Sequence, residues 1–315
     1  MIFKNCVNRR SVSSFCESWS THQERRIGVK RYCKNFKFTE EYIKECILKC
    51  LKSRWKRRDT AYFLAQYACD HKLSTKDVYT TAKYIHSYIK VGYRDKIIDD
   101  LVPIIAKDML NEINSHSVSF RPIIYQKRID SSSLKERNIG IASIKQQVYD
   151  YIAVEAMKPM LHAKIGKFQC ASIKGRGQTY AKKTIKKWLD KDPQGTKYWC
   201  KEDVRHYYLS VPHDVLKAYL KRDIKNDQLL YVTFSLIDTY EEGLCIGSYL
   251  SQYLGNYYLS YLYHYIEDNC YSTRRDKRVN FISHKLFYAD DIILFSPNLK
   301  NLQKARKMAD KFMRE

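Results

Sequence analysis

Two adjacent carboxylates stand where the sequence predicts the tip of a tight hairpin. The tetrapeptide Tyr288-Ala289-Asp290-Asp291 lies between two apolar runs, His284 to Ala289 and Ile292 to Ser296, that predict antiparallel β-strands. Like charges that are held together and partly withdrawn from water cost free energy unless something compensates them. A bound cation would be such a compensation. The alternative is an ordinary Asp-Asp turn, which hairpins favour without any chemistry.

A third carboxylate, Asp203, ends another predicted strand, Lys197 to Asp203, and the aromatic pair Tyr207 and Tyr208 follows it. If this strand joins the same sheet, Asp203 comes to lie beside Asp290. Carboxylates that converge from two strands form an oxygen-rich site for two Mg²⁺ ions, with Mn²⁺ as a substitute. Two such ions activate a primer 3′-hydroxyl and stabilise a leaving pyrophosphate, so these residues predict nucleotidyl transfer.

The charge of the chain indicates the same class of partner. Its 315 residues include 57 Lys and Arg against 34 Asp and Glu, which gives a formal net charge of +23. A field of this sign attracts polyanions, nucleic acid ahead of an acidic membrane surface. No apolar run approaches the ~18 residues of a membrane span, and the most apolar stretch is Ala61 to Cys69.

The cysteines do not form a recognisable metal or disulfide pattern. The chain has ten cysteines and no CxxC pair, and Cys46 and Cys50 lie one turn apart in an amphipathic helical pattern. We therefore expect reduced, buried thiols in a cytoplasmic protein that is not secreted. The first 26 residues are rich in Arg and Ser. We expect them to form a basic arm that contacts nucleic acid rather than a transit peptide.

The elements that must position the carboxylates follow from periodicity. From Phe38 to about Asn114 the pattern is helical, with Thr39 as an N-cap and a later helix opening at Ser74 with Asp77 in a capping box. The cluster Lys52 to Arg58 is either a solvated helix end or a nucleic-acid contact. Two β-like runs, residues 120–127 and 135–141, predict a hairpin with a polar loop. Further helices are expected at about 144–161, 178–189, 212–224, 227–240, 248–269 and 299–314, with a loop over 166–177 and strands at 197–203, 284–289 and 292–296. This order indicates an α+β fold with a helical N-terminal lobe.

At this point the motifs resemble those of a known family. Tyr288-Ala289-Asp290-Asp291 resembles the YxDD motif of reverse transcriptases, and Lys201 to Tyr208 resembles their first palm motif. The resemblance implies that Asp203, Asp290 and Asp291 are catalytic and bind the metal ions. It also implies that the Tyr208 ring packs under the nucleotide sugar, where a 2′-hydroxyl would collide with it.

Two further motifs occur in the order that the family shows. Gly243 to Gln252 is similar to the glycine turn and helix that contact template and incoming nucleotide, and Lys135 to Ile141 is similar to the fingers motif that holds the triphosphate. The implied partners are an RNA template, a DNA or RNA primer and dNTPs, without a membrane. The substrate-binding residues implied by these two motifs are Lys135, Arg137, Ile246, Gly247 and Gln252.

The resemblance also implies an architecture. We expect a basic helical region at 1–115, fingers at 116–196, and a palm at 197–297 with an antiparallel sheet covered by helices on one face. Residues 298–315 would begin a C-terminal helix. Only 24 residues follow Asp291, too few for the helical thumb that the family places next. Either the chain is a fragment, or an accessory protein supplies the clamp.

One departure from the common pattern suggests a subfamily. The stretch Ile246 to Gln252 fits the [ILV]GxxxSQ pattern of reverse transcriptases from diversity-generating retroelements. That subfamily copies RNA with errors at adenines, and an apolar side chain at 246 forgoes amide hydrogen bonds that would police pairing. Alternatives are ordinary packing of Ile246 in a faithful enzyme, a defence-associated enzyme with protein-primed or untemplated synthesis, and a non-catalytic RNA-binding relic.

Overall fold

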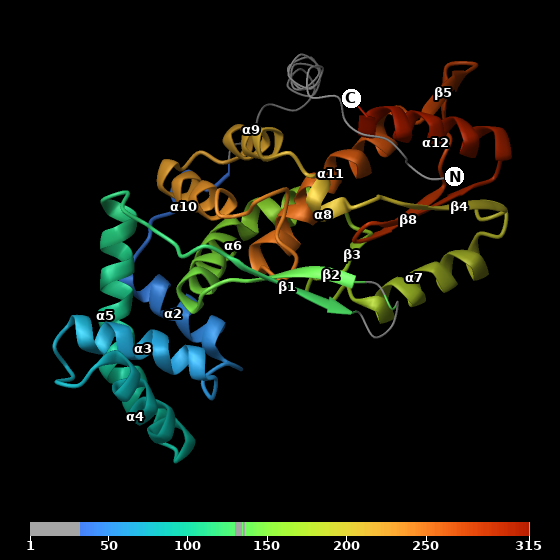
Figure 1. Ribbon diagram of the computed structural model, residues 1–315. Coiled ribbons are helices and arrows are strands. Elements are labelled where there is room, and N and C mark those ends of the chain that lie inside the picture. The colour runs from blue at the N-terminus through green and yellow to red at the C-terminus, as the bar shows by residue number, and fades with distance from the viewer. Residues whose placement is uncertain (1–31, 130–133, 135, 315) are drawn as a thin grey trace.

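Four helices follow one another at the start of the part of the chain that the computed structural model describes, residues 32–129, 134 and 136–314 (Figure 1). The predicted basic arm and Lys135 lie outside these residues. As expected, Thr39 caps the first helix, because its hydroxyl accepts a hydrogen bond from the Tyr42 N–H at 3.2 Å. The helices of this lobe are α2 (Glu40–Leu51), α3 (Arg58–Asp70), α4 (Val78–Lys90) and α5 (Arg94–Asn114).

The start of α4 differs from the prediction. The helix begins at Val78 rather than near Ser74, because the carboxylate of Asp77 accepts from the Thr80 N–H at 3.0 Å and acts as the N-cap. The Ser74 hydroxyl instead pairs with the hydroxyl of Thr81 at 2.7 Å. The Asp in the expected capping box is thus itself the cap.

A long buried helix, α6 (Ile144–Lys164), connects the lobe to the rest of the molecule. Helices α2, α10 (Asp227–Ile237) and α11 (Tyr249–Asn269) pack against it. A hairpin of β1 (Ile124–Ile129) and β2 (Glu136–Ile141) precedes it, as the sequence predicted. One hydrophobic core runs from Phe38 in the lobe to Ala309 near the C-terminus, so lobe and body share their apolar interior.

The central sheet has the strand order β3-β7-β8-β4. Its strands are β3 (Gln169–Cys170), β4 (Tyr198–Asp203), β7 (His284–Tyr288) and β8 (Asp291–Ser296). The expectation of a purely antiparallel sheet is wrong, because β3 pairs parallel with β7. This strand lies inside the predicted loop 166–177, and two residues are too short to produce a periodic pattern.

The expectation of helices on one face of the sheet is also wrong. Ile292 and Leu294 of β8 point into the main core, against which α11 and α12 (Leu299–Arg314) pack. The neighbouring side chain of Phe295 joins a second cluster with Trp188 of α7 (Gln178–Lys191). Because strand side chains alternate between faces, the four consecutive apolar residues Ile292 to Phe295 of β8 indicate a strand that is covered on both sides.

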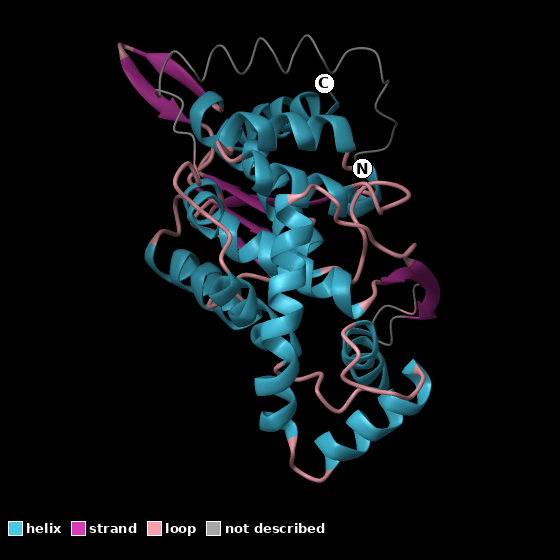
Figure 2. Ribbon diagram, turned by 90° about the vertical axis from the view of Figure 1, so that its left-hand side faces the viewer, coloured by secondary structure: helices cyan, strands magenta, loops and turns pink. Residues whose placement is uncertain are grey.

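Short elements complete the body. They are α8 (Tyr207–Ser210), α9 (His213–Asp223) and the hairpin of β5 (Tyr271–Arg274) and β6 (Lys277–Asn280), which projects away from the body (Figure 2). The sequence did not predict α8 or this polar hairpin. Among the described helices, none is long and apolar enough to cross a membrane.

Candidate active site

The tip of the β7-β8 hairpin is held tightly by its neighbours. Tyr288 pairs with Asp291, so only Ala289 and Asp290 form the loop. Ala289 has a φ of 51°, in the left-handed region that costs a residue with a side chain about 1 kcal/mol or more. Its N–H donates to the Cys170 carbonyl at 3.3 Å, and the Asp290 carbonyl accepts from the Val204 N–H at 3.2 Å. These bonds from β3 and from the end of β4 fix the strained tip.

The structure brings the three predicted carboxylates to this tip. In the register of β4 and β8, Asp203 lies directly opposite Asp291, and Asp290 is the adjoining loop residue. Asp203 is exposed, whereas Asp290 and Asp291 are half-buried. Burial raises the pKa of Asp290, and the negative charges of Asp203 and Asp291 raise it further. The carboxylates therefore repel one another, and a cation placed among them would relieve the repulsion.

A lysine supplies one positive charge at this place. The Nζ of Lys201 lies 2.7 Å from Oδ1 of Asp291. This hydrogen bond raises the pKa of Lys201, and the charges of Asp291, Asp203 and Asp290 add to the effect. In the described part of the chain, no three His, Cys, Asp or Glu side chains are arranged as a set of metal ligands. The oxygen atoms of these carboxylates nevertheless suit a hard divalent cation. Such a cation would compete with Lys201 for the carboxylate of Asp291.

The β1-β2 hairpin brings a second positive charge towards the carboxylates. Arg137 lies on β2, opposite Arg128 of β1, and its side chain is exposed. Its guanidinium lowers the pKa of Asp290, in opposition to the larger effect of burial. The structure thus places Arg137 within electrostatic reach of the palm carboxylates, whereas it does not describe Lys135.

A close approach of two glycines joins the β1-β2 hairpin to the turn before α11. The Gly140 N–H donates to the Ile246 carbonyl at 2.9 Å. Gly247 has a φ of 111°, and a Cβ atom there would lie 2.8 Å from the Gly140 carbonyl oxygen. A Cβ on Gly140 would lie 2.2 Å from Sγ of Cys245. The role of Gly140 was missed, although a glycine inside a predicted strand signals such an approach.

The other residues of this turn flank the contact. Ile246 is half-buried. Gln252, also half-buried, lies in the first turns of α11, where its carbonyl accepts a hydrogen bond from Nδ2 of Asn256 at 2.9 Å. The structure therefore brings Ile246 and Gly247 to the β2 strand, whereas Gln252 lies in the first turn of α11.

The two tyrosines after Asp203 occupy different environments. Tyr207 is buried, and its hydroxyl donates to the Gly255 carbonyl of α11. Tyr208 is half-buried; burial raises its pKa, and the charge of Asp290 raises it further. The Tyr208 carbonyl accepts from the Leu244 N–H at 2.7 Å, which ties α8 to the glycine turn. Tyr207 anchors the segment, and Tyr208 lies near the carboxylates.

Asp150 of α6 is a residue that the sequence analysis missed. Its buried carboxylate accepts hydrogen bonds from the Ser248 hydroxyl at 2.9 Å and the Tyr249 N–H at 3.2 Å, at the beginning of α11. Burial raises its pKa to about 7. The signal in the sequence was a lone acid between the apolar residues Tyr149 and Ile152. Asp150 fixes the helix end that carries the Gly247 turn.

Comparison with known proteins agrees with this geometry. The model of the family described as reverse transcriptase (RNA-dependent DNA polymerase) matches residues 127–315, more than half of the chain. No curated protein matches the chain. The matched segment contains β2, the Gly247 turn and all three carboxylates. The members of this family use a divalent metal, a nucleic-acid template and primer, and dNTPs. The chain belongs to the reverse transcriptase family, and it is an RNA-directed DNA polymerase.

Proposed function

We propose that Asp203, Asp290 and Asp291 form the catalytic site for DNA synthesis on an RNA template. The observation that supports this most directly is their convergence: Asp203 faces Asp291 across β4 and β8, and both charges raise the pKa of Asp290. A hairpin with no chemistry would gain nothing from keeping three repelling carboxylates on one edge. The bond from the strained Ala289 to Cys170 and the bond from Val204 to Asp290 keep them there.

The same carboxylates would hold two Mg²⁺ ions, or Mn²⁺ in their place. When bound, the ions supply activation of the primer 3′-hydroxyl and stabilisation of the leaving pyrophosphate. Asp203 and Asp290 are the principal ligands in this proposal, and Asp291 joins them once it exchanges its bond to Lys201. Arg137, within reach of Asp290, binds the triphosphate through its forked guanidinium, and Lys135 acts beside it.

The incoming nucleotide would lie between the fingers hairpin and Tyr208. The negative charge of Asp290 raises the pKa of Tyr208. In this proposal the Tyr208 ring occupies the space of a 2′-hydroxyl next to the reacting phosphate. Ile246 and Gly247 lie where β2 meets the turn before α11, and Gln252 lies in the first turn of that helix. In this proposal 116–196 are the fingers, 197–297 the palm, and 298–315 the beginning of a further helical element.

The experiment that tests the proposal is primer extension on a defined RNA with Mg²⁺ and dNTPs. The parental chain should extend the primer, and Asp290→Asn should abolish extension without lowering thermal stability, because it removes one of several repelling charges. Asp276→Asn, in the turn between β5 and β6, is the matched control and should keep parental activity. Parental extension by a folded Asp290→Asn variant would contradict the assignment of the site.

We further propose that the chain belongs to the error-prone, diversity-generating type. What supports this is the position and chemistry of Ile246. Its backbone carbonyl accepts from the Gly140 N–H of β2, and its half-buried apolar side chain has no amide group with which to test pairing geometry. Sequencing of the cDNA should show errors concentrated opposite adenines, and Ile246→Gln should reduce them. Uniformly low error would favour a faithful enzyme, whereas products unrelated to the template would favour untemplated synthesis.

A further inference from the structure

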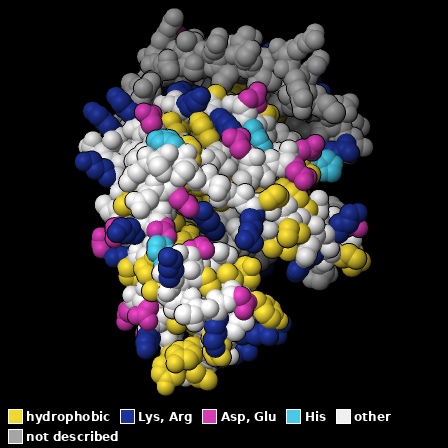
Figure 3. Space-filling view, turned by 60° about the vertical axis from the view of Figure 1, so that its left-hand side comes forward, with side chains coloured by type: hydrophobic (Ala, Val, Ile, Leu, Met, Phe, Trp, Pro, Cys, Tyr) yellow, Lys and Arg dark blue, Asp and Glu magenta, His cyan; other side chains and the backbone are white. Residues whose placement is uncertain are grey.

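The outward face of α4 combines exposed tyrosines with lysines. The exposed fractions of the tyrosines are 64% for Tyr79, 53% for Tyr84 and 46% for Tyr88. Lys83 and Lys90 lie between and after them, and α4 contains no Asp or Glu. Figure 3 shows hydrophobic side chains and Lys or Arg side by side at the lower end of the molecule, where Figure 1 places this helix. Large rings left in water beside cations on one helix are typical of a binding surface.

The rings and the cations of this face are in contact with each other. The Nζ of Lys76 lies 3.9 Å from the centre of the Tyr84 ring, and the Nζ of Lys83 lies 4.3 Å from that of Tyr79. Such contacts restrict the side chains before any partner arrives, which lowers the entropic cost of binding. A planar, negatively charged partner would find stacking faces and cations a few ångströms apart.

The basic cluster that follows α2 extends this face. Nε2 of His86 on α4 lies 3.1 Å from the carbonyl of Lys56, in hydrogen-bonding range, which ties the segment 52–58 to the helix. Trp55 is buried and contributes packing rather than stacking. This contact brings the backbone of Lys56 to α4, and the side chains of Lys52, Lys56 and Arg58 in the same segment are exposed. We call the Tyr/Lys surface the set Lys52, Lys56, Arg58, Lys76, Tyr79, Lys83, Tyr84, Tyr88 and Lys90.

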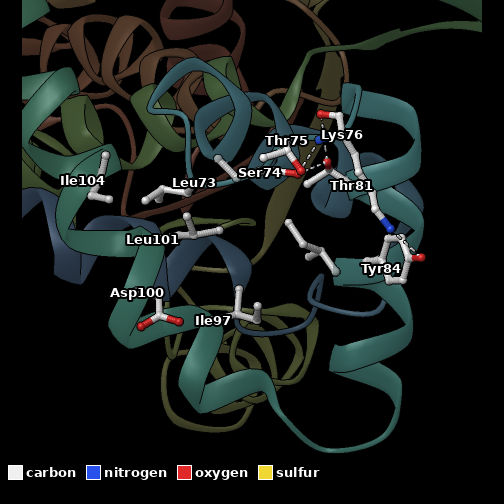
Figure 4. A pocket seen from close by; sticks show the side chains of 12 residues that line it. Leu73, Ser74, Thr75, Lys76, Thr81, Tyr84, Ile97, Asp100, Leu101 and Ile104 are labelled. Atoms are coloured by element: carbon white, nitrogen blue, oxygen red, sulfur yellow. Dashed lines mark hydrogen bonds between the residues drawn. The ribbon is translucent and has the colours of Figure 1, made fainter.

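A cavity of about 670 Å³ opens between α4 and α5, and Tyr84 of the Tyr/Lys surface is among the residues that line it. Figure 4 shows Lys76 reaching Tyr84 at one side of it, with Ile97 and Leu101 of α5 across from them. Its apolar wall and polar rim match the two parts of a nucleotide, a ring with an apolar face and a polar edge. The Tyr/Lys surface thus borders a space that accommodates an unstacked base.

We propose that the Tyr/Lys surface binds the single-stranded part of the RNA template outside the polymerase site. Unstacked bases stack on exposed aromatic rings, and backbone phosphates pair with lysines, whereas a duplex keeps its base faces covered. Helix α4 lies at the end of the molecule opposite to β4 and β8 (Figure 1). The RNA bound at α4 is therefore a part of the template that is not being copied while it is bound there. The identity of the strand as RNA rests on the activity of the family.

The first test compares two primer–templates in fluorescence anisotropy without dNTPs. One has a short template, and the other has a single-stranded RNA extension of about 15 nucleotides. The full chain should bind the extended form more tightly. The triple variant Tyr79→Leu, Tyr84→Leu, Tyr88→Leu (the Leu variant) should lose this gain, about tenfold in Kd. The Phe variant, with Tyr→Phe at the same three positions, should keep it, because it retains the rings. Equal Kd values of the Leu and Phe variants for the extended template would contradict the proposal that bases stack on these rings.

The second test addresses the lysines. Lys83→Gln with Lys90→Gln should reduce the slope of log K against log[salt] by about 1.4 for the extended template, at about 0.7 per phosphate contact. Lys107→Gln, an exposed lysine on α5, is the control and should leave binding of the extension unchanged. An equal loss in the control would mean that net charge alone is responsible and would overturn the proposal.

The remaining arms separate this surface from the polymerase site and from other partners. All α4 variants should extend a primer on the short template at the parental rate. The gain from the extension should also persist in Asp290→Asn, so loss of synthesis would not imply loss of this binding. Two results would show that the surface is not an RNA site. One is an equal gain in affinity from a single-stranded extension of the DNA primer. The other is sedimentation data in which the only effect of the Leu variant is to convert a dimer into monomers.

Discussion

At the scale of single residues, the Lys201 ammonium lies against Asp291, where a divalent cation bound to this carboxylate would have to displace it. This ammonium pairs with Asp291 at 2.7 Å, and both side chains are partly open to solvent, at 53% and 41% exposed. Removal of the ammonium should therefore free Asp291 for a divalent cation. Because a partly exposed pair is worth no more than about 1 kcal/mol, the gain in affinity should be modest.

We expect Lys201→Met to lower the Kd for Mn²⁺ by about two- to fivefold in isothermal titration calorimetry. Lys197→Met, an exposed lysine just before the same strand, is the matched control and should not change the Kd. If both variants bind Mn²⁺ like the parent, the ion pair does not compete with the metal.

Asp150 makes stability depend on pH at one buried position. Burial raises its pKa in the folded state from 3.8 to about 7. The folded state therefore binds this proton more strongly than the unfolded state does. The contribution of this bound proton to the free energy of unfolding is fully present below about pH 4 and is lost as the pH rises through about 7.

In Asp150→Asn the side-chain amide oxygen can still accept hydrogen bonds from Ser248 and Tyr249, but the amide group does not titrate. The difference in Tm between variant and parent should therefore grow in favour of the variant from pH 5.5 to pH 8. Asp99→Asn, at an exposed position, should show no such trend. Thermal melts at several pH values measure this, and parallel curves for parent and Asp150→Asn would contradict it.

At the scale of elements, the glycine contact decides where the fingers hairpin lies. Gly140 on β2 and Gly247 before α11 approach so closely that a Cβ on Gly247 would lie 2.8 Å from the Gly140 carbonyl oxygen. The β1-β2 hairpin carries Arg137 towards Asp290 from this point. A side chain at 247 should therefore push the hairpin away from the carboxylates.

We expect Gly247→Ala to raise the KM for dNTPs about tenfold, since a displacement of about 1 Å misplaces the triphosphate contact. Gly92→Ala is a close control, because Gly92 has a φ of 104°, near the 111° of Gly247, and a Cβ there would meet nothing within 4 Å. Both variants should lose stability from backbone strain, and only Gly247→Ala should lose nucleotide affinity. An equal KM in both would show that strain alone matters.

At the scale of the whole molecule, the helical lobe and the body share one hydrophobic core. Helix α2 packs on both α5 and α6, and α6 in turn packs on α11. The core cluster contains Trp55 of the lobe as well as Leu302 of α12. Exposing either part would uncover apolar surface of the other, so the two should unfold together.

Two single-tryptophan variants test this cooperativity. One keeps Trp55 in the lobe and the other keeps Trp188 on α7, with Phe in place of the other tryptophans, including Trp19 and Trp199. Their fluorescence should report the same unfolding midpoint in urea. Midpoints separated by more than the experimental error, with the lobe unfolding first, would mean that it is an independent unit.

The sequence by itself determined what depends on neighbouring residues. Strong periodicity located the long helices and the hairpin that carries Asp290 and Asp291, and the Thr39 cap was confirmed because capping is a local hydrogen bond. The spacing of carboxylates, glycines and tyrosines predicted the family. These features survive any rearrangement of distant segments, so one chain read in order was enough to find them.

The tertiary structure decided what depends on segments far apart in the chain. The parallel pairing of β3, the coverage of both sheet faces and the Gly140 to Gly247 contact arise from packing, which leaves no local period. The raised pKa of Asp150 depends on burial, and the bond of Lys201 to Asp291 depends on strand register. Charge and burial act through space, so only the folded chain brings these groups close enough to change one another.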